Sequence, residues 1–294
     1  MKTKNCLLII AIIGAFASNA QTGLTIKSGK VDSIPKKNSK SSIWTKVAPV
    51  SVTVLPQNIT SPKLQKSTIP SVKVTSINDG ITIGFLLEWT DSTKDIFVDA
   101  DKFCDQVAIQ LPMDAAQNPI FMMGNKNGRV HIIHWKSVWQ NDIENGFRDV
   151  KEAYPNYWTD VYPMAERQGD GSMGKYARDV SVKDYSKGQG KNFIPGFYAG
   201  NPMSIFDRKD PSEECIAEGF GTLTTQETQN ATAWGTWENN KWSVIITRAI
   251  NSSDPQDAAL PEKTKIAFAV WNGADENVSG RKHYSMWNDL VIEK

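Results

Sequence analysis

Residues 72–89 read VKVTSINDGITIGFLLEW, and this stretch carries the clearest structural signal in the sequence. Apolar residues recur at alternate positions on both sides of Asn78-Asp79-Gly80. Alternation with a period of two is typical of a strand that buries one face. An Asp-Gly pair between two such runs favours a tight turn, because both residue types tolerate the positive φ angles that the turn needs. The stretch therefore predicts a β-hairpin.

The same alternation recurs along most of the chain. Further strands are predicted at residues 51–55, 106–111, 129–136, 231–237, 242–249, 265–271 and 283–292. Two of these strands form a second predicted hairpin across Glu238-Asn239-Asn240-Lys241. Short strands without alternating helices predict an all-β fold, an antiparallel β-sandwich. Residues from about 142 to 212 interrupt the pattern and predict a long irregular insertion with a short helix over 142–153.

The composition excludes several classes of protein. The chain has 294 residues, with 33 Lys+Arg against 32 Asp+Glu, and a net charge of +1 gives no basis for electrostatic binding of nucleic acid. With 3 His and 3 Cys it cannot build a zinc ribbon or hold several iron–sulfur clusters. The 10 Trp, 7 Tyr and 11 Phe form an aromatic excess that these classes do not explain.

The first residues predict export. Lys2 and Lys4 precede an apolar run over 7–16, which is followed by small residues up to Ala20. This pattern is typical of a cleaved signal peptide over residues 1–20, and the run is too short for a membrane anchor. We expect a flexible lead-in over 21–42, a folded domain over 43–294, and a location in the periplasm or an equivalent compartment. No further apolar stretch predicts a transmembrane segment.

Cysteine and histidine give few chemical signals. In an oxidising compartment Cys104 and Cys215 could form a disulfide, and burial of both as small apolar side chains explains them equally well. No C-x-x-C-H is present, which excludes a c-type haem. His131 and His134 should point to opposite faces of one strand, so they cannot share a metal ion, and each is expected to be solvated or satisfied in the core. His283 is a candidate ligand, although a single histidine is more often structural.

No enzyme motif is found: the sequence lacks G-x-S-x-G, a Walker A loop and H-E-x-x-H. Met122-Met123-Gly124 stands before a turn at Asn125-Lys126-Asn127-Gly128. A methionine usually fills gaps in a core, but a thioether is also a common axial ligand of an electron-transfer haem. The segment Gly280-Arg281-Lys282 is typical of solvated surface charge. The residues alone favour a core methionine and surface charge for these two segments, with the haem ligand as the alternative for the methionine.

Taken in order, a set of short segments resembles one known family. It is the haem-b-binding γ subunit of ethylbenzene dehydrogenase and of its relatives, dimethyl sulfide dehydrogenase, chlorate and selenate reductases and nitrite oxidoreductase. The resemblance covers about residues 43–292. Its segments are 78–80 with 85–89, Asp91 and Asp95, 103–112, 121–124, 134–136, 199–202, 217–224, 242–244, 267–273 and 280–282.

The resemblance implies a fold and a function. It implies a β-sandwich similar to carbohydrate-binding modules, which binds haem b with Met and Lys as the axial ligands of the iron. By motif, the methionine is Met123, with Met122 as the alternative one position away, and the lysine is Lys282. Arg281 is a weaker candidate for contact with the haem propionates. The aromatic excess would then divide between the core and the haem walls.

The implied protein transfers electrons and does not catalyse a reaction alone. Its expected partners are a molybdopterin-containing catalytic α subunit, an iron–sulfur β subunit and an external soluble cytochrome. The main alternative is a carbohydrate-binding β-sandwich without haem, which would stack sugars on exposed tryptophans. A third reading is a scaffold without a ligand, in which the insertion serves as a docking surface.

Overall fold

The computed structural model describes residues 23–117, 119–146, 148, 156, 195–199, 201, 204–205 and 208–294. The predicted signal peptide, most of the predicted insertion and the end of the predicted helix lie outside these residues, so they stay predictions. Every helix in the described part of the chain is too short or too polar to span a bilayer.

The described residues form a mixed sheet of 14 strands, whose main path runs β10-β11-β5-β4-β1-β14-β12-β6-β7-β8-β9. Strand β2 pairs with β4, β13 pairs with β12, and β3 pairs with β13. The strands are β1 (Thr25–Lys30), β2 (Val50–Thr53), β3 (Leu55–Pro56), β4 (Ser71–Asn78), β5 (Thr82–Thr90), β6 (Gln106–Pro112), β7 (Val130–Lys136), β8 (Ser212–Ala217), β9 (Thr224–Thr225), β10 (Thr232–Trp237), β11 (Lys241–Ala249), β12 (Lys263–Trp271), β13 (His283–Tyr284) and β14 (Asn288–Ile292). The helices are α1 (Ser137–Asn145) and α5 (Pro195–Tyr198), with 3-10 turns at Ser42–Lys46, Ala115–Gln117 and Gly273–Asp275.

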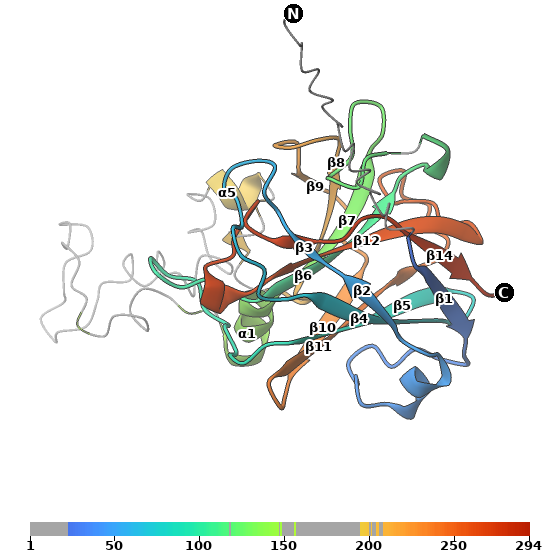
Figure 1. The fold of residues 1–294 in the computed structure, drawn as a ribbon, viewed down its shortest axis with the longest axis horizontal. Helices are drawn as coiled ribbons and strands as arrows, with labels where there is room; N and C mark the ends of the chain where they lie inside the picture. Colours follow the sequence, from blue (N-terminus) through green and yellow to red (C-terminus); the bar gives the residue numbers. More distant parts are fainter. Residues whose placement is uncertain are drawn as a thin grey trace, which may run out of the picture.

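Strand β12 divides this sheet into two layers (Figure 1). Residues 263–266 of β12 pair with β14, whereas residues 267–271 pair with β6. The first layer holds β10, β11, β5, β4, β1 and β14, and the second holds β6, β7, β8 and β9. The core lies between them and includes Phe85, Leu87 and Val244 from the first layer and Ile109, Ile133 and Phe268 from the second. The predicted β-sandwich is confirmed.

The 72–89 hairpin forms as predicted, with β4 antiparallel to β5. Gly80 has φ 89°, an angle that costs an L side chain energy, and the Oδ1 atom of Asp79 accepts hydrogen bonds from the amides of Ile81 and Thr82. The second hairpin also forms, and both Asn239 and Asn240 have positive φ there. A two-residue turn with positive φ at both positions matches the twist of the strands that it joins.

The predicted flexible lead-in is wrong for residues 25–30, which form β1. This strand lies parallel to both β14 and β4, so the sandwich is mixed and not purely antiparallel. Only Ile26 supplies this strand with a buried apolar side chain, and the surrounding polar residues conceal the strand in the composition. Residues that follow β1 are also ordered, because Trp44 packs with Ile77 and Leu86 on the outer face of the first layer.

Three further boundaries differ from the prediction. The predicted strand over 283–292 is two strands, because the Ser285 hydroxyl donates to the Met286 carbonyl and accepts from the Phe268 amide at the break. Helix α1 begins at Ser137, directly after β7, and not at residue 142. Gln140 holds its start in place, since its Oε1 accepts from Trp135 Nε1 at 3.0 Å and from Gly235 N at 2.7 Å. Strands β8 and β9 were not predicted.

Candidate functional site

A cavity of about 730 Å³ lies on the outer face of the second layer. Its volume is within the range of small-molecule sites, about 300–1,000 Å³. Strands β6, β7, β8, β12 and β13 supply side chains, and the loop 119–128 and the segments 57–61, 220–223 and 278–280 complete its wall. Strand alternation sends every second residue away from the sandwich core, so this face is a second buried surface.

The floor of the cavity is flat and apolar. Ala108 of β6 lies directly opposite Ala269 of β12, so two methyl groups stand where larger side chains would fill the space. Ile132 and Trp271 join Ala108 in one apolar cluster, against which Met123 packs. Phe121 stacks on Tyr284 at the wall, with ring centroids 5.8 Å apart. These residues suit a planar apolar ligand.

Met123 reaches the cavity from a constrained loop. Its backbone has φ 65°, a left-handed conformation that is uncommon outside glycine and asparagine and is found most often at functional sites. Gly219 N donates to the carbonyl of Met123 at 2.8 Å and holds this conformation. A Cβ on Gly124, whose φ is 75°, would lie 2.5 Å from the carbonyl oxygen of Gly128. Met122 also lines the cavity.

Lys282 lines the same cavity from the opposite end of the sequence. Its carbonyl accepts from Gln57 N at 2.9 Å, and its Nζ lies 5.0 Å from the ring centroid of Trp271. Burial lowers the pKa of Lys282 to about 8. His283, the next residue, is fully buried, and its Nε2 accepts from the amides of Thr68 and Ile69. Those bonds give His283 a structural role and turn it away from the cavity.

Of the four predicted site residues, the fold brings together Met122, Met123 and Lys282. Arg281 is not among the residues that line the cavity in the described structure. Its Nη1 lies 3.2 Å from Oε2 of Glu276, in an exposed ion pair. Arg281 ends a turn, in which its amide donates to the carbonyl of Val278, and its side chain points to Glu276 outside the cavity.

The sequence predicts His134 to be solvated or satisfied in the core, and it predicts no site among the polar residues at one end of the cavity. We define this polar end as Gln106, His134, Lys136 and Glu213, which line the cavity from β6, β7 and β8. The ring of His134 stacks on Trp271 with centroids 4.7 Å apart, and its buried Nε2 has no hydrogen-bond partner among the described residues. Burial lowers the pKa of His134, and nearby Lys136 and Lys282 lower it further. The sequence holds one signal for this polar end. In β7, His134 and Lys136 alternate with Ile133 and Trp135, so the polar and apolar side chains lie on opposite faces.

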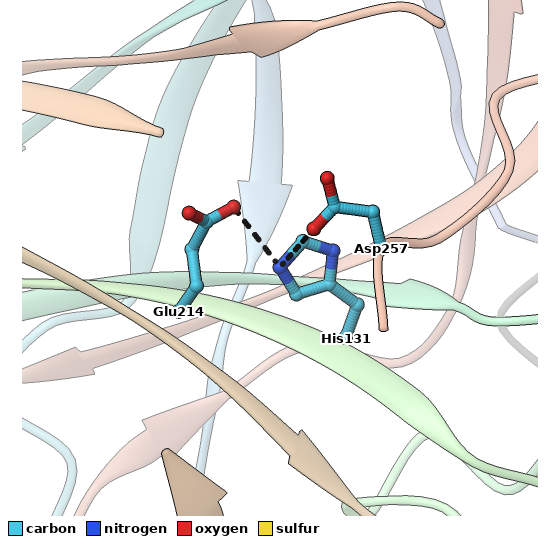
Figure 2. Close-up of side chains that lie close together, drawn as sticks. All are labelled: His131, Glu214 and Asp257. Atoms are coloured by element: carbon cyan, nitrogen blue, oxygen red, sulfur yellow. Dashed lines mark ion pairs between the residues drawn. The ribbon is translucent and has the colours of Figure 1, made fainter. Parts of the chain in front are cut away.

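A second group of ionisable residues lies in the core between the layers (Figure 2). The Nε2 of His131 lies 3.4 Å from Oε1 of Glu214 and 3.8 Å from Oδ1 of Asp257. All three side chains are buried, as is Arg248, whose Nη2 lies 3.9 Å from Oδ2 of Asp257. As predicted, His131 and His134 point to opposite faces of β7, because His131 enters this group and His134 enters the cavity.

The hydrogen bonds of His131 decide what this group can bind. Arg248 Nη1 and Ala258 N both lie 3.2 Å from Nδ1, and both are donors. The neutral ring must therefore carry its proton on Nε2, so this nitrogen offers no lone pair to a metal ion. Metal-bound histidines show the reverse arrangement, in which the second ring nitrogen donates. We interpret the group as a polar junction that joins β7, β8 and β11.

Three carboxylates, Asp91, Asp95 and Asp105, also lie close together. Asp105 accepts from Gly273 N at 2.8 Å, from Trp242 Nε1 at 2.9 Å and from Asp95 N at 2.8 Å. Burial and the nearby charge of Asp91 raise the pKa of Asp105 to about 8. Backbone and indole donors already occupy this carboxylate, so its role is to connect β6 with the segment after β12.

Cys104 and Cys215 are both free and buried. Of the two readings left open by the sequence, the structure favours small buried side chains over a disulfide. Burial raises the pKa of both thiols, which keeps them protonated.

Comparisons with known proteins identify a family and a distant relative. The family model described as "Ethylbenzene dehydrogenase" matches residues 41–283. A protein of Haloferax mediterranei named "Putative respiratory nitrate reductase heme subunit ORF7" is 21% identical over 250 residues, which cover 84% of this chain and 65% of that protein. The chain thus spans less than two thirds of the length of that relative.

Two solved structures are also similar. Both are of a family 9 carbohydrate-binding module from Caldicellulosiruptor kristjanssonii. The complex with glucose has a TM-score of 0.42 and 8% identity, over 92% of this chain and 95% of that chain. The complex with cellotriose has a TM-score of 0.38 and 8% identity, over 92% and 93%.

Proposed function

Since this chain belongs to the ethylbenzene dehydrogenase family, we propose that it binds haem b and transfers electrons as the γ subunit of a molybdopterin oxidoreductase complex. The relative from Haloferax mediterranei, which is named as a heme subunit, supports the cofactor. The observation that carries the proposal is that Met123 and Lys282, which lie in distant parts of the sequence, line one cavity.

The cavity residues fit haem by their chemistry. A thioether and an amine are two donors that would hold a haem iron, and the paired alanines leave apolar space for the macrocycle. Aromatic rings of Phe121, Tyr284 and Trp271 wall the same space. The polar end suits the carboxylates of a haem. Bound haem would supply a one-electron redox couple.

Each proposed ligand has a task set by its surroundings. Lys282 must present a neutral amine, and burial helps because it lowers the pKa of this group to about 8. Met123 presents a soft thioether, which favours the reduced iron. If Met123 and Lys282 both hold the iron, the protein would leave it no open position for a substrate. We therefore assign the chain an electron-transfer role and no catalysis of its own.

Membership of the family supports the proposed partners and location. The complex would contain a molybdopterin catalytic α subunit and an iron–sulfur β subunit, and an external soluble cytochrome would exchange electrons with this chain. The predicted signal peptide over residues 1–20 would send the chain to the periplasm or an equivalent compartment.

A haem titration of the purified chain, followed by its visible spectrum, tests the proposal. The wild type should take up haem and give a low-spin b-type spectrum. Met123→Ala and Lys282→Ala should each remove one axial ligand and shift the spectrum toward a high-spin form. Met286→Ala and Lys27→Gln are matched controls, because both side chains are exposed and lie outside the cavity.

The outcomes separate the parts of the proposal. No uptake by the wild type would refute the haem-binding function. Uptake with unchanged spectra in both ligand variants would refute the ligand assignment. A shift in Met122→Ala and not in Met123→Ala would move the ligand by one position.

The carbohydrate-binding alternative gains no support from the tryptophans. Nine of the ten lie in the described part of the chain, and none of these nine is exposed. A sugar platform of the expected kind needs an exposed aromatic face.

A further inference from the structure

The polar end of the cavity is assembled by strand register. Gln106 lies opposite Lys136 in the β6–β7 pair, and His134 lies opposite Glu213 in the β7–β8 pair. The four side chains therefore occupy two neighbouring rows at one edge of a floor whose other residues are mostly apolar. A ligand with charge at one edge and an apolar body would match this distribution.

Lys136 is the cation that this edge offers to a ligand. Its half-buried side chain places Nζ 4.1 Å from the ring centroid of Trp139. In the described structure no carboxylate oxygen lies within 4.0 Å of this Nζ, and no hydrogen bond to it is found. Lys282 is the other cation lining the cavity, and the proposed function uses it as an iron ligand. Arg281 pairs with Glu276 outside the cavity.

We propose that Lys136 binds a propionate carboxylate of the haem, so that the polar end is the site that orients the cofactor. This inference rests on the proposed function and replaces Arg281 in the role that the resemblance implied for it. A charged donor in a partly buried site forms a short, strong hydrogen bond with a carboxylate. The resulting contact would select one orientation of the macrocycle on the floor.

Two further charges act on Lys136. Glu213 lines the same cavity, and its Oε1 accepts from Thr225 Oγ1 at 2.5 Å. Arg208 lies on the same indole as Lys136, with its Cζ 4.1 Å from the ring centroid of Trp139. Glu213 should oppose a second carboxylate, whereas Lys136 should attract it. Neutral substitutions of Lys136 and of Glu213 should therefore change the affinity for haem in opposite directions.

The test compares haem with haem dimethyl ester, which has the same macrocycle and iron but no carboxylate charge. Dissociation constants come from titrations of the purified chain, followed at the Soret band. Lys136→Gln should weaken haem binding about tenfold or more and leave ester binding nearly unchanged. Glu213→Gln should tighten haem binding several-fold, again without an effect on the ester. Lys136→Arg keeps the charge and should restore affinity for haem.

Lys27→Gln, which removes an exposed lysine of β1, controls for the change in net charge. Thermal unfolding of each ligand-free variant shows whether it is folded at the temperature of the titration. An equal loss of affinity for haem and for its dimethyl ester in Lys136→Gln would overturn the inference, because the contact would then not involve the carboxylates. A selective loss in Arg281→Gln, with none in Lys136→Gln, would also overturn it and return the role to Arg281. In both cases haem uptake by the wild type leaves the proposed function standing, whereas no uptake would refute both.

Discussion

Some residues at the cavity have backbone conformations that cost free energy, and the rest of the fold must offset this cost. Met123 is the clearest case, since a left-handed backbone at a bulky residue costs about 1–3 kcal/mol. Its neighbour Gly124 also has positive φ, and a Cβ at that position would lie 2.5 Å from the carbonyl oxygen of Gly128. A strained residue that lines a cavity is a stronger functional signal than a methionine in the sequence alone.

The first prediction follows from Gly124. Gly124→Ala should lower the free energy of unfolding by about 2–4 kcal/mol, because the new Cβ meets the Gly128 carbonyl and the backbone has positive φ. Gly146→Ala is the matched control: φ is 86° there, and no atom of the described residues lies within 4 Å of the added carbon. Urea denaturation should show a smaller loss for the control. Equal losses would mean that the close approach contributes nothing.

The second prediction concerns the polar junction in the core. Arg248→Met removes the cation that faces two buried carboxylates, Glu214 and Asp257, and should destabilise the fold by about 3–5 kcal/mol. Arg281→Met breaks an exposed ion pair with Glu276 and should cost about 0–1 kcal/mol. Chemical denaturation of both variants measures the difference. Similar small costs would show that the buried charges do not need Arg248.

Individual strands differ in how far the sequence predicts them. Both hairpins were predictable because their turn residues lie next to the strands that they join. Strand β1 was not, since its partners β4 and β14 lie far along the chain and only Ile26 marks its buried face. The break between β13 and β14 depends on a hydrogen bond to Phe268 from another strand, which no local pattern records.

The residues of the candidate site also differ in how far the sequence predicts them. Resemblance supplied Met123 and Lys282, and the fold places both at one cavity. The roles of His134, Lys136 and Glu213 depend on which strands are neighbours, and β8 was not predicted at all. Arg281, the weaker candidate that the resemblance implied, does not line the cavity in the described structure, because its side chain pairs with Glu276 outside it.

The third prediction tests whether β1 is part of the fold. Ile26→Ala should cost about 2–5 kcal/mol, because this side chain is 1% exposed and belongs to the core between the layers. Lys27→Ala, in the same strand, points to solvent and should change stability by less than about 0.5 kcal/mol. If both variants unfold at the same urea concentration as the wild type, residues 25–30 are a flexible lead-in after all.

For the whole molecule, Asp105 sets a pH dependence of stability. Burial and repulsion from Asp91 raise its pKa to about 8 in the folded chain, against about 3.9 when unfolded. The folded state therefore keeps this proton up to a higher pH than the unfolded state does. The resulting contribution of Asp105 to the free energy of unfolding is fully present below about pH 4 and is lost as the pH rises through about 8.

The fourth prediction is therefore that the free energy of unfolding falls more steeply with pH in the wild type than in Asp105→Asn. Urea titrations at about pH 5, 6, 7 and 8 give the two slopes. The exposed Asp289→Asn should keep the slope of the wild type. Parallel slopes in wild type and Asp105→Asn would show that this carboxyl does not exchange its proton over that range.

The position of β12 has a consequence for how the molecule loses its structure. One half of the strand belongs to each layer, so neither layer can open without removing a strand from the other. Hydrogen exchange should accordingly find the amides of both layers in one cooperative unit rather than in two separate ones. The strands that line the cavity should then unfold together with Ile266 and Leu290, two core residues that do not line it. Destabilising substitutions anywhere in β12 should therefore lower the fraction of the protein that binds the cofactor, because only the folded chain can bind it.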